Sequence, residues 1–185
     1  MEGKPTHAAE WFSKAIIERP GDASLYWGRS HAWEMAGNPR QAVLDAGIGV
    51  CLRPRVAAGF VRLSAAYGAR GRHAHVVRAC YLGMRCGDSS KNGELGRRMS
   101  AAREAGKLPP LEWTPADRRE RWMWAFLSFR AFLLRTAAGI AGRARFGGVG
   151  VALIEGACRA TGEQGFVRPP WPRGAMPPVL LPPCA

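Results

Sequence analysis

The residues that could support acid–base, nucleophilic or metal chemistry are few and scattered along the 185-residue chain. The histidines are His7, His31, His73 and His75, and the cysteines are Cys51, Cys80, Cys86, Cys158 and Cys184. His73 and His75 stand two residues apart at a predicted helix start, where they face different directions and hold one metal ion poorly. Cys80 follows His73 at helical spacing, but no acid that could orient such a pair lies near it in the sequence. Gly147-Gly-Val-Gly lacks the lysine and the preceding strand of a phosphate loop. The sequence therefore predicts no catalytic residue, no cofactor and no metal site.

The cysteines and the amino terminus indicate a compartment. No two cysteines have CxxC spacing, and their number is odd, so we expect reduced thiols that are mostly small core residues. The first residues, Met1-Glu-Gly-Lys-Pro, lead into no apolar stretch of a signal peptide. Uncharged runs also fall short of the roughly 18 apolar residues of a spanning helix. These features predict a cytoplasmic protein.

The chain is strongly basic, with a formal net charge of +13. Such a charge is compatible with binding nucleic acid, an anionic membrane surface or acidic peptides. Because the positive charge is spread along the whole chain, it shows no concentrated nucleic-acid footprint. We therefore expect a protein or peptide partner, favour an acidic one, and consider nucleic acid unlikely.

The most informative feature is self-similarity at an interval of 34 residues. The matched positions are Pro20 with Pro54, Tyr26 with Phe60, Trp33 with Tyr67, Gly37 with Gly71, Ala42 with Val76, and Ala15 with Gly49 and Gly83. Small residues at matched positions allow two antiparallel helices to approach closely, and the aromatic residues fill the space between successive pairs. Gly37 and Gly71 suit the left-handed cap that ends a helix, and Pro39 suits the first turn of the next one.

This pattern predicts an all-α fold in which paired helices stack into a solenoid. The expected helices span about 8–18, 23–35, 39–51, 56–70, 72–86 and 90–105, the last acting as a capping helix. Together they form a repeat domain over residues 8–103, with about 2.5 repeats plus the cap.

The segments that carry the period resemble the tetratricopeptide repeat family. The closest stretches are Phe12-Ser-Lys-Ala-Ile-Ile, Leu25-Tyr-Trp-Gly-Arg-Ser, Leu52-Arg-Pro and Gly59-Phe-Val-Arg, and they look like the three-repeat domain of stress-inducible co-chaperones. The resemblance implies a concave surface that grips a peptide or helix of a partner protein. In that family lysine, asparagine and arginine side chains form a carboxylate clamp, which is largely missing here. Gly28 and Ala58 stand at two of its positions, and only Arg62 matches.

The candidate partner-binding residues are therefore Arg62, Arg29, Tyr26 and Phe60. The segment before residue 8 is too short for the first helix of a complete repeat. We expect this gap to leave Trp11, Phe12 and Ile16 needing cover, either from another chain or from the tail of this one.

The second half has no family pattern. Residues 104–114 read as a linker, and Thr114-Pro115 begins a basic amphipathic helix over 115–145. Its residues predicted to contact a membrane or a partner helix are Trp122, Phe126, Phe129, Leu133, Arg130 and Arg135. Residues 146–185 are rich in Gly and Pro and are expected to be largely disordered, although Val149–Arg159 could form a short apolar helix.

Three roles stay open for the helix over 115–145: packing back on the repeats, lying on an anionic membrane, or docking into a partner's groove. The sequence favours an interaction adaptor that is co-chaperone-like but not an enzyme. The alternative is a peripheral membrane protein attached through residues 115–145. Oligomeric state is left open.

Overall fold

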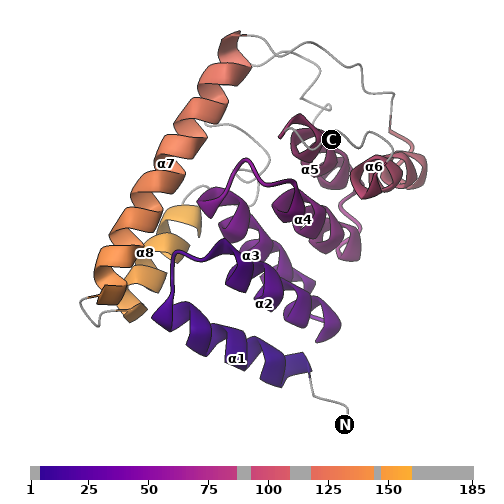
Figure 1. Cartoon of the computed structure of the whole chain (residues 1–185). Helices are drawn as coiled ribbons and strands as arrows, with labels where there is room; N and C mark the ends of the chain where they lie inside the picture. Colours follow the sequence, from indigo (N-terminus) through magenta and orange to yellow (C-terminus); the bar gives the residue numbers. More distant parts are fainter. Residues whose placement is uncertain (1–4, 87–92, 109–117, 144–146, 160–185) are drawn as a thin grey trace.

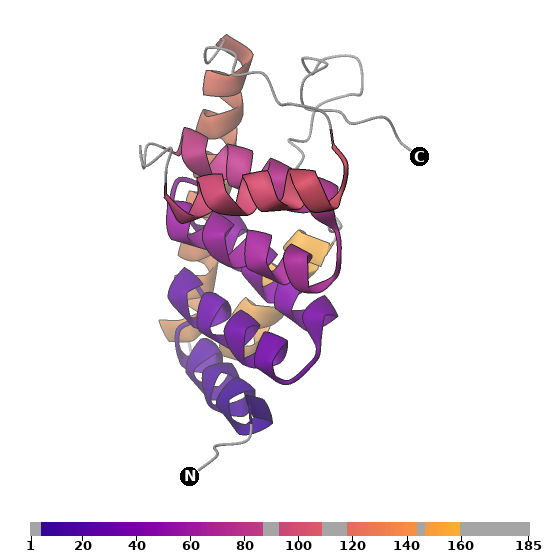
Figure 2. The ribbon, with the colours of Figure 1, turned by 90° about the vertical axis from the view of Figure 1, so that its right-hand side faces the viewer.

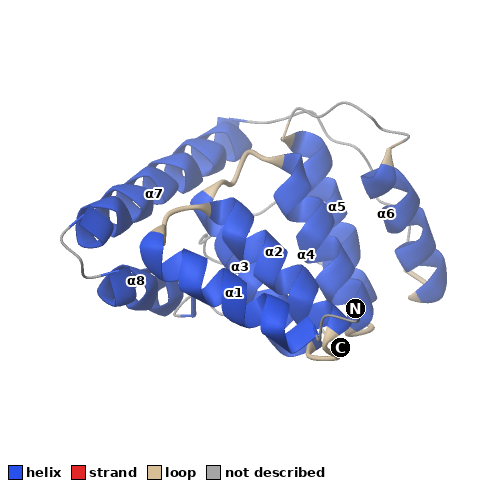
Figure 3. Ribbon diagram, turned by 60° about the horizontal axis from the view of Figure 1, so that its bottom comes forward, coloured by secondary structure: helices blue, strands red, loops and turns tan. Residues whose placement is uncertain are grey.

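A computed structural model describes residues 5–86, 93–108, 118–143 and 147–159. Within these ranges every residue lies in a helix or a connecting turn, and no strand is present (Figure 3). Side chains of the last two ranges are described from Leu127 to Ile140 and, except for Cys158, from Gly148 to Arg159. The helices are α1 (Pro5–Glu18), α2 (Ala23–Met35), α3 (Pro39–Leu52), α4 (Ala57–Ala69), α5 (His73–Arg85), α6 (Glu94–Ala105), α7 (Arg118–Arg143) and α8 (Gly147–Arg159).

The prediction of an all-helical fold is confirmed for the described residues. The six helices expected before residue 106 begin and end within four residues of the predicted positions. Local chemistry explains two of the boundaries. The side chain of Asn38 accepts a hydrogen bond from the amide of Gln41, and Pro39 begins α3, where its missing N–H costs nothing. Gly37 and Gly71 follow α2 and α4 with φ of 73° and 66°, a conformation that favours glycine.

Helices α1 to α6 form a stack in which each packs against the next along the chain (Figure 1). Contacts also join α2 to α4 and α4 to α6, so these three helices share one side of the stack. Several positions 34 residues apart have the same burial: Tyr26 and Phe60 are both buried, and so are Ser30 and Ser64, although Trp33 is half-buried where Tyr67 is fully buried. The interval seen in the sequence is therefore also an interval in packing.

Close helix packing depends on residues without bulk. A Cβ atom placed on Gly49 of α3 would clash with Nε1 of Trp27 in α2. The indole of Trp27 thus lies directly on the α3 backbone. Interiors packed this densely tolerate little added volume.

Helices α7 and α8 pack against each other, and we call this pair the hairpin. It contacts α1 and α3 on the side of the stack away from α6, and α7 runs along one edge of the molecule (Figure 1). Buried Ala138 of α7 and Ile154 of α8 belong to the same core cluster as the stack residues. Of the three roles open for the helix over 115–145, packing back on the preceding helices is the one that the structure contains.

The predicted boundary at residue 146 falls between α7 and α8, two helices that pack on each other. The expected linker over 104–114 overlaps the end of α6, and most of it lies outside the described residues, as does the tail from residue 160. The hairpin also answers the question of what covers α1. Ile16 is fully buried and α8 contacts α1, whereas Trp11 remains 69% exposed.

The contact between Gly49 and Trp27 gives a stability test. We expect Gly49→Ala to lower the free energy of unfolding by about 1–3 kcal/mol, because the new methyl group overfills the α2–α3 contact. Gly68→Ala in α4 is the matched control, since nothing lies within 4 Å of a Cβ atom there. It should raise stability by about 0.5–1 kcal/mol through helix propensity. Urea unfolding followed by circular dichroism measures both; equal shifts in the two variants would contradict the packing described.

Candidate functional site

Arg29 of α2 lies at the centre of a buried charge cluster. Its Nε and Nη2 atoms donate to Oδ2 and Oδ1 of Asp45 in α3, each at 2.7 Å. Nη1 donates to the hydroxyl of Ser13 in α1 at 3.2 Å, and Nη2 also reaches Oε1 of Glu155 in α8 at 3.3 Å. Only 12% of the Arg29 side chain and 4% of the Asp45 side chain are exposed. One guanidinium therefore joins four helices, including one from the hairpin.

The positive and negative charges of this cluster come from four side chains. Burial lowers the pKa of Arg29, but the bonds and charges of Asp45 and Glu155 outweigh it and raise the pKa overall. Burial raises the pKa of Asp45, as does the charge of Glu155, and together they outweigh the lowering by Arg29. Arg159 pairs with the other oxygen of Glu155 at 2.9 Å. Two cations thus face two carboxylates. Arg29, expected to bind a partner, is instead a buried structural residue.

The aromatic candidates are also core residues. Tyr26 and Phe60 are 0% and 1% exposed, so neither side chain can reach a partner. The Tyr26 hydroxyl donates to the carbonyl of Pro20 at 3.0 Å, which satisfies its polar atom inside the protein. The prediction that these two residues line a binding surface is therefore wrong. The matched aromatic positions mark the space between helix pairs, where large side chains fill the core.

Arg62 is the one sequence-predicted partner residue that lies at an accessible face. It forms an ion pair with Glu34 of α2, and its Nη1 lies 3.1 Å from Nδ1 of His31. Because a guanidinium only donates, this imidazole nitrogen must accept. Burial lowers the pKa of Arg62, and so does the charge of Arg98 in α6, while Glu94 opposes this. The sequence missed Glu34 and His31, although their spacing of three placed them on one helical face.

The residues around Arg62 define what we call the open face, formed by the uncovered sides of α2, α4 and α6. It comprises His31, Glu34 and Met35 of α2, Ala58, Arg62, Ala65 and Ala69 of α4, and Glu94 and Arg98 of α6. Arg98 pairs with Glu94 at 2.6 Å along α6. The α4 strip is made of small residues apart from Arg62. A partner backbone or helix can therefore come close to α4 along this strip.

The predicted residues of α7 divide between two sides. Phe129 and Leu133 are 60% and 50% exposed and face away from the stack, whereas the packed side consists of Leu127, Ala131, Leu134 and Ala138. Arg130 donates to the carbonyl of Ala157 in α8 at 3.1 Å, and Arg135 donates to Ala131 within α7 at 3.3 Å. The side chains of Trp122 and Phe126 lie outside the described residues.

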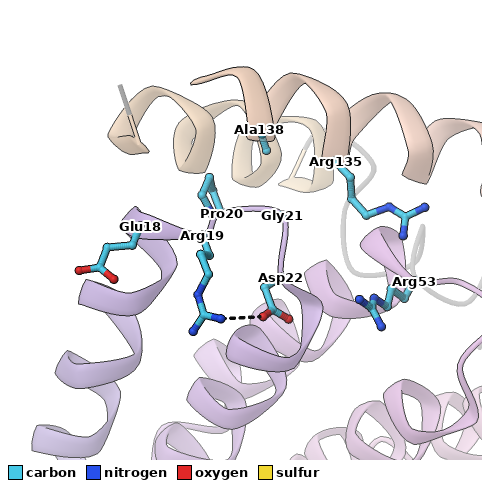
Figure 4. A pocket seen from close by; sticks show the side chains of 9 residues that line it. Glu18, Arg19, Pro20, Gly21, Asp22, Arg53, Arg135 and Ala138 are labelled. Carbon is cyan, nitrogen blue, oxygen red and sulfur yellow. Dashed lines mark ion pairs between the residues drawn. The ribbon is translucent and has the colours of Figure 1, made fainter. Parts of the chain in front are cut away.

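A cavity of about 520 Å³ lies where the α1–α2 turn, the end of α3 and the α7 helix meet (Figure 4). We call it the junction cavity; its charged residues are Glu18, Arg19, Asp22, Arg53 and Arg135. Arg19 and Asp22 pair at 3.9 Å. Burial raises the pKa of Asp22, but hydrogen bonds from Ser24 and the charges of Arg19 and Arg53 outweigh this, so the pKa is lowered overall. Arg53 and Arg135 lie on the side of the cavity away from Glu18 (Figure 4).

The described residues assemble no metal site: no three His, Cys, Asp or Glu side chains among them gather closely enough. Cys80 is fully buried, and burial raises the pKa of its thiol to about 11 despite a hydrogen bond with Ser64. A thiol of this kind stays protonated near neutral pH and is a poor nucleophile. No helix within the described ranges has the length and apolar character to cross a bilayer.

Comparisons of the chain with protein-family models, with curated proteins and with solved structures find no match. The likeness to tetratricopeptide repeats therefore stays a prediction from the sequence. Functional inference rests on the geometry of the described residues.

The charge cluster predicts that removing a buried arginine destabilises the protein much more than removing an exposed one. Arg29→Ala should lower the free energy of unfolding by about 3–5 kcal/mol, because it leaves the Asp45 carboxylate buried without its cation. Arg98→Ala removes an exposed pair of the same chemistry and should cost at most about 1 kcal/mol. Restoring the balance with Arg29→Met/Asp45→Leu should recover most of the loss. Denaturant unfolding of the three variants tests this, and a small cost for Arg29→Ala would refute the role of the cluster.

Cys80 predicts a specific loss of stability in alkali. Its pKa rises from 9.0 in the ordinary thiol to about 11 in the folded protein, so the unfolded chain loses this proton first. Stability from the buried thiol is complete below the unfolded pKa and falls as pH rises through the interval between the two values. Between about pH 7 and pH 10 the wild type should lose roughly 1 kcal/mol more than Cys80→Ala. Unfolding is measured in a non-thiol reductant; parallel pH profiles would contradict the assignment.

Proposed function

We propose that this protein is a non-enzymatic adaptor of tetratricopeptide-repeat type, which binds an acidic segment of a partner protein on its open face. The observation that carries the proposal is the position of the hairpin. It packs on α1 and α3, so that within the described part of the chain the side formed by α2, α4 and α6 has no covering helix. In Figure 2 α6 lies in front of the stack, whereas α7 and α8 lie behind it.

The repeat assignment is supported by the recurrence of burial at an interval of 34 residues. Tyr26 and Phe60 occupy matched core positions, and Gly37 and Gly71 end matched helices with positive φ. Contacts of α4 with both α2 and α6 bring three helices to one side, as a peptide-binding surface requires. Such arrays bind extended segments or helices on the surface that their stacked helices share.

The chemistry of the open face favours a partner that is both acidic and apolar. Arg62 and Arg98 supply cations, while Met35 is 65% exposed and the alanines of α4 offer a flat apolar strip. Arg62 already has Glu34 as a partner, so an incoming carboxylate must exchange with Glu34 rather than fill a vacant position. This exchange reduces the net gain from each charged contact. We therefore expect micromolar rather than nanomolar affinity, and no tight grip on chaperone tails.

Selection of peptides from a displayed random library against the full chain tests the proposal. Selected peptides should combine carboxylates with an apolar residue. Arg62→Ala should weaken their binding about tenfold, which corresponds to about 1.4 kcal/mol, and Glu34→Gln should strengthen it by removing the competing carboxylate. Arg40→Ala, an exposed arginine of α3, is the matched control and should change affinity less than about twofold. Calorimetry measures each affinity, and equal binding to wild type and Arg62→Ala would reject the open face as the site.

A further inference from the structure

Helix α7 is apolar on two opposite sides, and only one of them is packed. The inner side joins the core of the stack through Ala138, with Leu127 and Leu134 packed against it. The outer side carries Phe129, Phe132, Leu133 and Ile140, each between 50% and 61% exposed. Of the nine large apolar side chains that are exposed in the described part of the chain, six belong to the hairpin. An exposed apolar surface gathered in this way marks an interaction site.

The outer residues form a straight row. At about 100° per residue, Phe129, Leu133, Thr136 and Ile140 fall within roughly 60° of one another, and Phe132 lies at the edge. We call these five residues the outer row. With a rise of about 1.5 Å per residue, the row extends roughly 16 Å along the helix.

The outer row has no side-chain donor left for a partner. Its one polar residue, Thr136, donates its hydroxyl to the carbonyl of Phe132 at 2.9 Å. The remaining members are hydrocarbon. Protein interfaces combine apolar contact with directional polar bonds, whereas the acyl boundary of a bilayer requires only apolar contact. The chemistry of the row therefore favours a lipid surface.

Positive charge on α7 complements an anionic surface. The helix contains six arginines and one glutamate, a net charge of +5. Arg130 and Arg135 lie on the two flanks of the outer row by helical spacing. Arg130 donates to the Ala157 carbonyl of α8, whereas the exposed Arg135 can extend its long side chain to lipid phosphates. Arg135 also lines the junction cavity, in which Arg53 lies on the same side and Arg19 is already paired with Asp22. Arg53 thus adds a second cation beside one flank of the row.

We propose that the outer row of α7 docks onto an anionic membrane surface, with the helix lying in the interface. The helix binds along the bilayer and does not cross it, in agreement with its basic composition. The inference goes beyond the adaptor proposal and does not depend on it, because the hairpin and the open face lie on different sides of the stack (Figure 2).

Co-sedimentation of the full chain with vesicles tests the proposal. Wild type should bind vesicles of phosphatidylcholine with about 30% phosphatidylserine, and added salt should weaken this binding. It should bind phosphatidylcholine alone at least about tenfold less. Phe129→Ser/Leu133→Ser should reduce binding to the anionic vesicles about tenfold or more. Ile17→Ser, which alters a 52% exposed apolar residue of α1, is the matched control and should bind like wild type.

Circular dichroism and the urea midpoint establish that each variant is folded before it is compared. Absent binding to anionic vesicles, or equal binding by wild type and the outer-row variant, would overturn the proposal. A second copy as the occupant would also overturn it: sedimentation equilibrium would then show a wild-type dimer that the variant cannot form, without vesicle binding. Loss of vesicle binding with peptide binding unchanged would support the membrane surface and leave the adaptor proposal intact.

Discussion

The paired bonds from Arg29 to Asp45 constrain how the whole chain can pack. A guanidinium and a carboxylate buried to this degree are tolerated only when the remaining donors and acceptors also find partners. Ser13 and Glu155 supply them, and they come from the first and the last described helices. The correct placement of α2 against α3 is therefore linked to the correct placement of α1 and α8. Although the sequence of the hairpin differs in character from that of the repeats, the two share one polar core.

The position of the hairpin has consequences for both proposed surfaces. Helix α8 contacts α1, the first described helix, in which Ile16 is fully buried. Because α8 lies there, α7 is held beside α3 with its outer row facing away from the stack. The open face is untouched by this arrangement. The protein thus presents two chemically different surfaces. The open face combines charged and apolar side chains, and the outer row is apolar with basic residues on its flanks.

The 34-residue interval predicted the helices correctly because the matched residues are of two kinds. Some have the size that a helix contact requires, and others are the glycines and prolines at which helices end. The interval did not show which matched residues face a partner: Tyr26 and Phe60 recur because the core recurs. Besides Asp45, Arg29 has a partner 126 residues away at Glu155, where no local pattern points to it. For α7 the pattern drew attention to Phe129 and Leu133, whereas Ala131 and Ala138 make the packed side. Close helix contact requires small residues such as alanine. These residues are only mildly hydrophobic, so a hydrophobicity pattern does not reveal the side of the helix on which they lie.

The pairing of Arg62 with Glu34 shapes what recognition on the open face can achieve. If a partner carboxylate replaces Glu34 at the guanidinium, one charged contact is exchanged for another, and Glu34 must be solvated again. The net favourable free energy then has to come from apolar contact with Met35 and the alanine strip of α4. The charged pair selects which segments fit, because a segment without an acid leaves Glu34 in place as a barrier to close approach. A purely acidic peptide and a purely apolar one should therefore both bind poorly, and only a segment that places the two chemistries at the right separation gains from both.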